Sequence, residues 1–158
     1  MKGWMGAGLL TGIAAGLVLA GAMNVSVAQM KNDPIKERVA LMEEISKANK
    51  VITAYGKSGK GKPEAVRAAA KKVSGHAVKV VTLFPAGTSS DEMKGKTRAK
   101  KDIWTKRAEF EKAGAELKAA ADKVAMAGDE KALKAAAADV SKTCGGCHKA
   151  FRGPKPKG

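Results

Sequence analysis

Hydrophobic residues recur every three or four positions along four stretches of this chain, the spacing that places them on one face of an α-helix. The first stretch starts at Asp33-Pro34, where a capping side chain precedes a proline, and it ends at Gly56. The second runs from Pro63 to the helix-breaking Pro85. The expected inward positions of the four helices are, in order, Ile35, Val39, Met42, Ile45, Ala48, Ile52 and Tyr55; Val66, Ala70, Val73, Ala77, Val80 and Phe84; Ile103, Trp104, Arg107, Phe110, Gly114, Leu117, Ala121 and Val124; and Leu133, Ala136, Val140, Cys144, Cys147 and Phe151.

Three connections join these helices, and the one spanning residues 86–98 is the longest. Short connections favour antiparallel neighbours, so we expect an all-α fold, an up-down-up-down antiparallel four-helix bundle. No stretch shows the alternation that is typical of a β-strand. In this topology the start of the first helix, the end of the second, the start of the third and the end of the fourth share one pole of the bundle.

The N-terminal residues differ from the rest of the chain. Lys2 precedes an uncharged, apolar run from Gly3 to Met30, and Ser26-Val27-Ala28 has the small residues that a signal peptidase prefers. We expect residues 1–28 to be a signal peptide that directs export to the periplasm, with an uncleaved membrane anchor as the alternative. The remaining residues, 29–158, have the length of a single domain.

One motif stands out near the C-terminus, Cys144-Gly145-Gly146-Cys147-His148. Two cysteines three positions apart, with a histidine directly after the second, are typical of the covalent attachment of one c-type haem. Residues at i and i+3 project from the same side of a helix, so both thiols can reach one haem edge while His148 coordinates the iron. A zinc site would need about four ligands, and a thioredoxin-like pair would need a βαβ context, so neither suits this chain.

The charge of the chain bears on its partners. It contains 30 basic and 15 acidic residues, a formal net charge of +15, and all but one of these charged residues follow residue 28. The basic residues are scattered around every predicted helix without interleaved aromatic residues, so we expect no nucleic-acid partner. The basic surface instead favours docking onto an acidic redox partner. Membrane contact is expected only through the N-terminal segment, if that segment is not cleaved.

A second iron ligand, opposite His148, must come from the same pole of the bundle. We favour Met42, which lies on the inward stripe of the first helix; ordinary core packing is the alternative for a methionine at such a position. His76 is a weaker candidate at the edge of the apolar stripe, about two turns before the end of the second helix. Met93 lies in the long connection, and Met126 is excluded because it ends the third helix at the opposite pole.

Residues 29–158 resemble the class II c-type cytochromes, which comprise the cytochromes c′ and their low-spin cytochrome c-556 relatives. The matching residues are the haem motif with Lys149-Ala150-Phe151-Arg152 after it, Leu83-Phe84-Pro85, Ile103-Trp104 with Phe110, and Arg38 with Met42 four residues later. The resemblance implies a four-helix bundle in which Cys144 and Cys147 anchor a haem near the C-terminus. It also implies that Arg152 lies close to the proximal face of the haem and that Arg38 lies near a propionate.

The resemblance also bears on the distal side of the iron and on function. In cytochromes c′ this position usually holds a non-ligating apolar side chain, whereas here it is Met42, as in c-556-like members. A six-coordinate iron with His148 and Met42 as ligands is therefore implied, and with it electron transfer. The alternative is binding of small gases, nitric oxide or carbon monoxide, at a five-coordinate or Met-gated haem. We see no catalytic constellation and expect no enzyme. Some relatives form homodimers through the first two helices, and this sequence is compatible with a homodimer.

The signal-peptide interpretation predicts that the exported protein begins at Gln29. Mass spectrometry of protein purified from the periplasm is expected to give the mass of residues 29–158 plus one haem. A mass that includes residues 1–28 would show that the segment is retained as an anchor.

Overall fold

A computed structural model describes residues 33–155, and in this part of the chain the structure is helical, without β-strands. The predicted signal peptide lies outside the described residues. None of the described helices combines the length and hydrophobicity that a membrane span requires. The helices are Pro34–Ser58 (α1), Pro63–Thr82 (α2), Asp102–Thr105 (α3), Arg107–Met126 (α4) and Glu130–Phe151 (α5).

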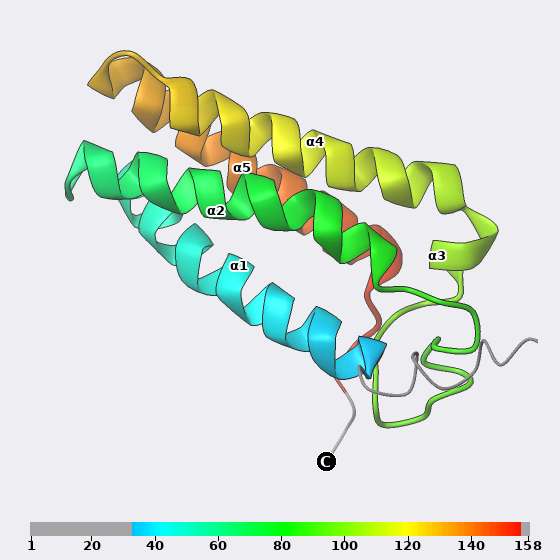
Figure 1. Cartoon of the computed structure of the whole chain (residues 1–158). Helices are drawn as coiled ribbons and strands as arrows, with labels where there is room; N and C mark the ends of the chain where they lie inside the picture. Colours follow the sequence, from blue (N-terminus) through cyan, green and yellow to red (C-terminus); the bar gives the residue numbers. More distant parts are fainter. Residues whose placement is uncertain (1–32, 156–158) are drawn as a thin grey trace, which may run out of the picture. The chain divides into compact units, whose positions relative to one another are not determined.

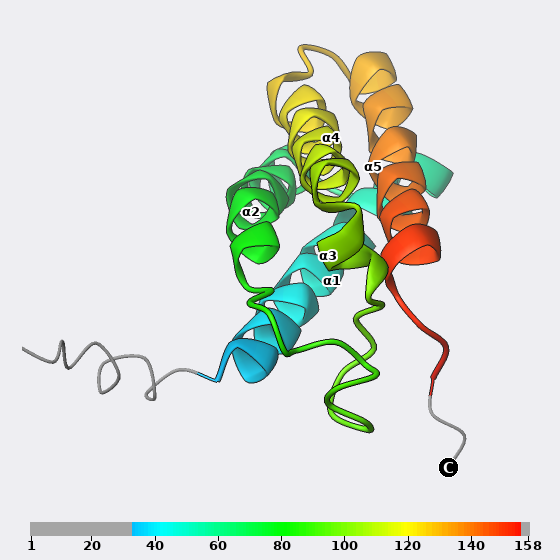
Figure 2. The ribbon, with the colours of Figure 1, turned by 90° about the vertical axis from the view of Figure 1, so that its right-hand side faces the viewer.

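The four long helices form the predicted antiparallel bundle (Figure 1). Helix α1 packs against α2 and α5, and α4 packs against the same two helices. Long helices that follow one another in the sequence therefore lie side by side, as in an up-down-up-down bundle. Figure 2 views the end of the bundle where the start of α1, the end of α2, helix α3 and the end of α5 meet. We call this end the motif pole.

The ends of α1 follow from local capping. The Asp33 carboxylate accepts a hydrogen bond of 2.9 Å from the backbone N–H of Ile35, which stabilises the first turn as predicted. The helix does not end at Gly56, as the sequence led us to expect, but continues to Ser58. Gly59 then adopts a left-handed conformation with φ of 67°, which costs glycine less than any other residue.

The predicted third helix is interrupted. Lys106 has non-helical backbone angles, φ −121° and ψ 48°, and separates the short α3 from α4. The indole N–H of Trp104 in α3 lies 3.2 Å from the carbonyl oxygens of both Phe84 and Pro85. These carbonyls follow α2, which ends at Thr82 rather than at Phe84. Hydrogen bonding to the segment after α2 thus fixes the position of α3, a long-range contact that helical periodicity cannot show.

The hydrophobic core consists of two clusters. The first, which we call the main cluster, occupies most of the bundle and contains residues from all four long helices. The second, the aromatic cluster, lies at the motif pole and is built on Ala99, Ile103, Phe110 and Phe151. Edge-to-face contacts stabilise it, with ring centres 4.9 Å apart for Phe84 and Phe110 and 5.2 Å apart for Phe110 and Phe151.

One predicted inward position of α1 was wrong. Val39 is 48% exposed, whereas Leu41 is buried and continues the three- and four-residue steps to Ile45. At the start of α1 the inward position belongs to Arg38, a charged residue that a search for apolar stripes passes over. In α5 the predicted Ala136 is half-buried and packs against the main cluster, beside the fully buried Ala137.

Close packing of α2 against α4 yields a stability prediction. A Cβ added at the buried Gly114 would lie 2.5 Å from Cγ1 of Val81, so Gly114→Ala requires the Val81 side chain or the helices themselves to shift. Such overpacking is expected to lower the free energy of unfolding by about 1–3 kcal/mol, measured by chemical denaturation.

A matched control is Gly75→Ala on the exposed face of α2, where an added Cβ would meet no atom within 4 Å. This change is expected to stabilise the helix by about 0.5–1 kcal/mol. Equal stability of the two variants would contradict the close contact, and Val81→Ala should restore much of the loss in Gly114→Ala.

Candidate functional site

The Cys-Gly-Gly-Cys-His motif continues α5 without a break. Cys144 and Cys147 are both half-buried and, being three residues apart, project from the same side of the helix. Cys144 packs against the main cluster and Cys147 packs against the aromatic cluster. Burial raises the pKa of both thiols. The two sulfur atoms therefore lie where the two hydrophobic clusters adjoin.

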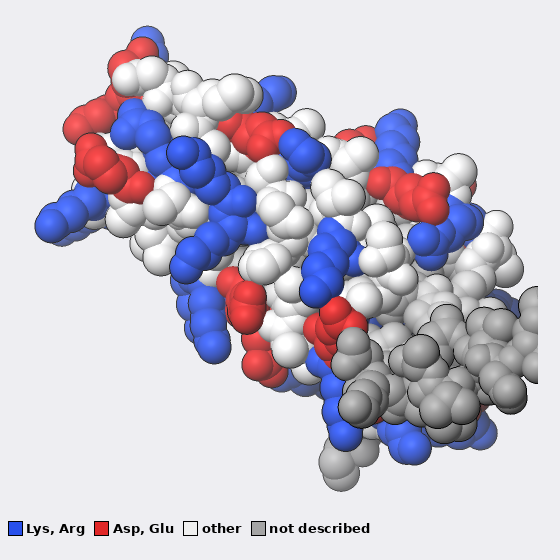
Figure 3. Space-filling view, viewed as in Figure 1, with Lys and Arg blue, Asp and Glu red and all other residues white. Residues whose placement is uncertain are grey.

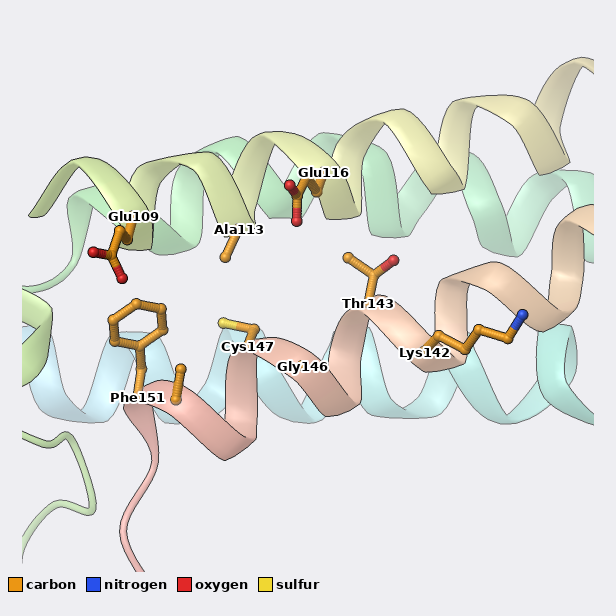
Figure 4. Close-up of a pocket in the computed structure, with 9 residues that line it drawn as sticks. Glu109, Ala113, Glu116, Lys142, Thr143, Gly146, Cys147 and Phe151 are labelled. Atoms are coloured by element: carbon orange, nitrogen blue, oxygen red, sulfur yellow. The ribbon is translucent and has the colours of Figure 1, made fainter. Parts of the chain in front are cut away.

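A cavity of about 420 Å³ opens beside Cys147, between α4 and α5. Figure 4 shows the sulfur of Cys147 in the space between the two helices, with Ala113 on the facing helix and the ring of Phe151 to one side. The exposed charged side chains of Glu109, Glu116 and Lys142 complete the lining, together with Thr143, Gly146 and Ala150. The volume falls within the range of small-molecule and cofactor sites. All of its lining residues belong to α4 and α5, so the cavity lies on the α4 side of the motif helix.

The two glycines of the motif are exposed. A Cβ added at Gly145 or Gly146 would meet no atom within 4 Å, so the packing of the chain itself does not require glycine there. Glycine inside a helix is unfavourable relative to alanine by about 1 kcal/mol. The open space beside the helix backbone leaves room for a flat ligand to approach closely.

His148 is half-buried and follows Cys147 directly. Burial lowers the pKa of its imidazole, and the nearby positive charges of Arg152 and Arg98 lower it further. Both effects favour the neutral ring, which keeps the nitrogen lone pair that coordination of iron requires. Arg152 is exposed at the end of α5, and its backbone N–H donates to the carbonyl oxygen of His148 at 3.0 Å.

Met42 is half-buried on α1 and packs against the main cluster. Cys144 packs against the same cluster from α5, which is a neighbour of α1. The structure thus brings Met42 and Cys144 to one cluster, although Met42 does not line the cavity beside Cys147.

The other candidates for a second ligand lie elsewhere. His76 faces α1, with its Nε2 atom 3.1 Å from the carboxylate of Glu44. Met93 is half-buried in the long connection, where its backbone N–H donates to Ser89. Met126 is 75% exposed at the opposite pole, as expected.

The donors present suit a metal that is held in a macrocycle. Among residues 33–155, no three histidine, cysteine, aspartate or glutamate side chains are placed to bind a metal ion on their own. The chain does offer two thiols on one face of a helix, an imidazole directly after them, and apolar surface beside both sulfur atoms. These are the groups that hold a c-type haem, and the described residues fit it.

Comparison with known proteins decides the family, because a family model described as Cytochrome C′ matches residues 33–152. The chain belongs to the cytochrome c′ family. Cytochrome c′ of Rhodopseudomonas palustris (strain ATCC BAA-98 / CGA009) is 34% identical over 145 residues, which cover 89% of this chain and 94% of that protein. Members of the cytochrome c′ family carry covalently bound haem c, so the predicted cofactor is confirmed.

Known structures of cytochromes share the fold. The structure of oxidized R. palustris cytochrome c556 has a TM-score of 0.68 and 29% identity, covering 78% of this chain and 98% of that one. A cytochrome c′ with ligand-controlled dimer dissociation has a TM-score of 0.67 and 27% identity, covering 77% of this chain and 95% of that one. The predicted four-helix bundle of a c-type cytochrome is therefore confirmed.

In this cytochrome Arg38 has a role that the sequence did not reveal. It is only 4% exposed, and its two terminal nitrogens donate four hydrogen bonds, three to the long connection and one to Leu83 just after α2. Nη1 donates to the Thr88 hydroxyl at 2.9 Å and to the Leu83 carbonyl at 3.3 Å. Nη2 donates to the Thr88 carbonyl at 2.8 Å and to the Thr97 hydroxyl at 2.6 Å. Arg38 precedes Leu41 and Ile45 by steps of three and four residues, and this spacing could have indicated that the arginine lies on the buried face of the helix.

A second feature missed at the sequence level joins the long connection to the end of α5. The backbone N–H of Lys100 donates to the carbonyl of Phe151, and the N–H of Gly153 donates to the carbonyl of Arg98. The Arg98 side chain donates to the Gly153 carbonyl at 2.6 and 2.9 Å. We call this antiparallel pairing, centred on Ala99 and Arg152, the clasp.

The contacts of Arg38 predict its contribution to stability. Arg38→Met removes four hydrogen bonds from a buried side chain and leaves half-buried carbonyl and hydroxyl groups with fewer partners, so the free energy of unfolding should fall by about 2–4 kcal/mol. Hydrogen exchange in residues 83–97 should also become faster than in wild type.

The control is Lys36→Met on the exposed side of the same helix, which is expected to change stability by less than about 0.5 kcal/mol. If Arg38→Met matched this control in stability and exchange but lost haem, Arg38 would act on the haem rather than on the connection.

Proposed function

We propose that residues 29–158 form a periplasmic electron-transfer protein with one covalent haem c. Cys144 and Cys147 would hold the haem through thioether bonds, and His148 would be the proximal iron ligand. The iron supplies a centre that takes up and releases one electron. Haem attachment takes place outside the cytoplasm, which agrees with the proposed removal of residues 1–28 as a signal peptide.

Met42 is proposed as the second ligand. The observation that carries this proposal is the packing of Met42, from α1, against the same cluster that Cys144 contacts from α5. Its thioether is uncharged and half-buried, so it is available to a soft or borderline metal without the loss of an ion pair. Methionine ligation also raises the reduction potential of a haem.

Iron ligation by Met42 from α1 and His148 from α5 would favour electron transfer. A six-coordinate iron has no open position for a substrate, and α1 and α5 are held together along the bundle, so little rearrangement accompanies the change of charge. Members of the family are haem-binding carriers. We therefore propose a carrier rather than an enzyme, with an acidic redox protein as its partner.

Arg38 and Arg152 are proposed to act near the haem as well. Arg152 lies one turn after His148, where its charge is close to the imidazole. The terminal nitrogens of Arg38 donate hydrogen bonds to the long connection. A contact with a haem propionate would therefore be a second role for this side chain. Dimer dissociation is ligand-controlled in one relative, and gel filtration of the loaded protein would show whether this chain forms homodimers.

Gas binding is the second candidate function. The observation that favours it is the half-buried thioether of Met42, which nothing but packing holds in place among the described residues. A small neutral gas could then occupy the distal position when the methionine dissociates.

Absorption spectra of the loaded protein test the two functions. In the ferric and ferrous states the wild type is expected to be low-spin and unchanged by carbon monoxide. Met42→Ala is expected to become high-spin, to bind carbon monoxide and to have a lower reduction potential, because the thioether ligand is lost.

Met126→Ala is the matched control, because this methionine is exposed at the opposite pole. Its spectra should match the wild type. A high-spin wild type that binds carbon monoxide would mean that Met42 is core packing and would favour gas binding. Absence of covalent haem would contradict both functions.

A further inference from the structure

The motif pole gathers positive charge from two distant segments. Residues 94–106 and 148–155 are joined by the clasp and together contain nine lysines and arginines but one carboxylate, that of Asp102. We call these nine side chains the cationic surface: Lys94, Lys96, Arg98, Lys100, Lys101, Lys106, Lys149, Arg152 and Lys155.

The opposite pole is more balanced. Its two connections, with the adjoining helix ends, are residues 57–67 and 123–134, which contain seven lysines and arginines and three carboxylates. Figure 3 shows a similar mixture over α2 and α4, where acidic side chains are interspersed among the basic ones. The excess of positive charge is therefore larger over these two segments of the motif pole than over the connections at the other end of the bundle.

Within the described part of the chain, none of the nine charges of the cationic surface is neutralised by an ion pair, and two of them are held in place by backbone carbonyls. None of the ion pairs formed among residues 33–155 includes any of the nine side chains. Arg98 donates to the carbonyls of Gly153 and Pro154, and the Lys100 ammonium donates to the carbonyl of Lys149 at 3.1 Å. Carbonyl oxygens fix a cation without cancelling its charge. Uncompensated like charges repel one another and destabilise the fold, so a counter-charge from outside would relieve this cost.

We infer that the cationic surface is the docking site for an acidic protein partner of the cytochrome. The inference rests on the proposed electron-transfer function and deepens it by naming the surface. The motif residue His148 begins the second segment and lies close to Arg152 and Arg98, one from each segment, so a partner bound there would be next to the haem attachment site. Positive potential of this kind steers an acidic partner and speeds its association, in a manner that salt weakens.

A protein partner fits this surface better than a membrane does. The exposed large hydrophobic side chains of the described residues are Val39, Val51, Val78 and Met126, and all lie outside the two segments. Phe151 and Ile103 point into the aromatic cluster, and the Trp104 indole is hydrogen-bonded to backbone carbonyls. Interfacial binding to lipid needs apolar side chains that insert between headgroups.

The test compares two loaded variants with the same change of net charge. The first is the triple variant Lys94→Glu, Lys96→Glu and Lys101→Glu, whose side chains are exposed on the cationic surface. The second is Lys60→Glu, Lys62→Glu and Lys131→Glu at the opposite pole, also exposed. Stopped-flow absorption gives the rate constant for reduction of the ferric haem by a reduced, negatively charged [2Fe–2S] ferredoxin, at low and high salt. An uncharged hydroquinone serves as the reference reductant.

The first variant is expected to react with ferredoxin about tenfold more slowly than wild type at low salt, and to lose most of the salt dependence. The second is expected to stay within about twofold of the wild-type rate, and both should keep the wild-type rate with hydroquinone.

Equal rates for the two variants with ferredoxin would overturn the docking site. Binding to phosphatidylglycerol vesicles that is lost only in the first variant, without an effect on ferredoxin, would favour a membrane instead. A wild type that neither ferredoxin nor hydroquinone reduces would contradict the electron-transfer function itself.

Discussion

The backbone pairing of the clasp is the constraint on which the motif pole depends. It ties the end of α5 to the segment just before α3, which lies up to 55 positions earlier in the sequence. Because Phe151 belongs both to the clasp and to the aromatic cluster, the same bonds that end the helix also close the core at this pole. His148 lies within the last turn of that helix, so the position of the imidazole follows from where the clasp stops α5.

Buried and half-buried cations at this pole are stabilised mainly by neutral oxygen atoms. Arg38 donates to carbonyl and hydroxyl groups and lies over the ring of Phe84, 4.5 Å from its centre. Arg107 likewise donates to the carbonyl of Val81 at 2.9 Å, although it also pairs with Glu111. Such bonds satisfy the donors and order the long connection while leaving the positive charge intact. These contacts hold the pole in place and leave it electropositive. Carboxylate partners would have neutralised that charge.

Helical periodicity and the haem motif were enough to predict the bundle, its topology and the pole at which the motif lies. The spacing of Cys144 and Cys147 predicted a shared helix face, because that depends only on local geometry. Features set by contacts between distant segments were not predicted. The break at Lys106 and the clasp follow from hydrogen bonds across the pole. The buried Arg38 was missed because its partners lie more than 40 residues away.

The position of Trp104 gives the protein a built-in optical reporter. The chain contains two tryptophans, Trp4 and Trp104, and the first lies in the proposed signal peptide. The mature chain would then contain a single indole, bonded to the carbonyls of Phe84 and Pro85 and packed against the aromatic cluster. Circular dichroism reports the long helices of the whole bundle, whereas the emission of this indole reports its motif pole alone. The order in which the bundle and its haem-bearing end assemble can therefore be followed in the unlabelled protein.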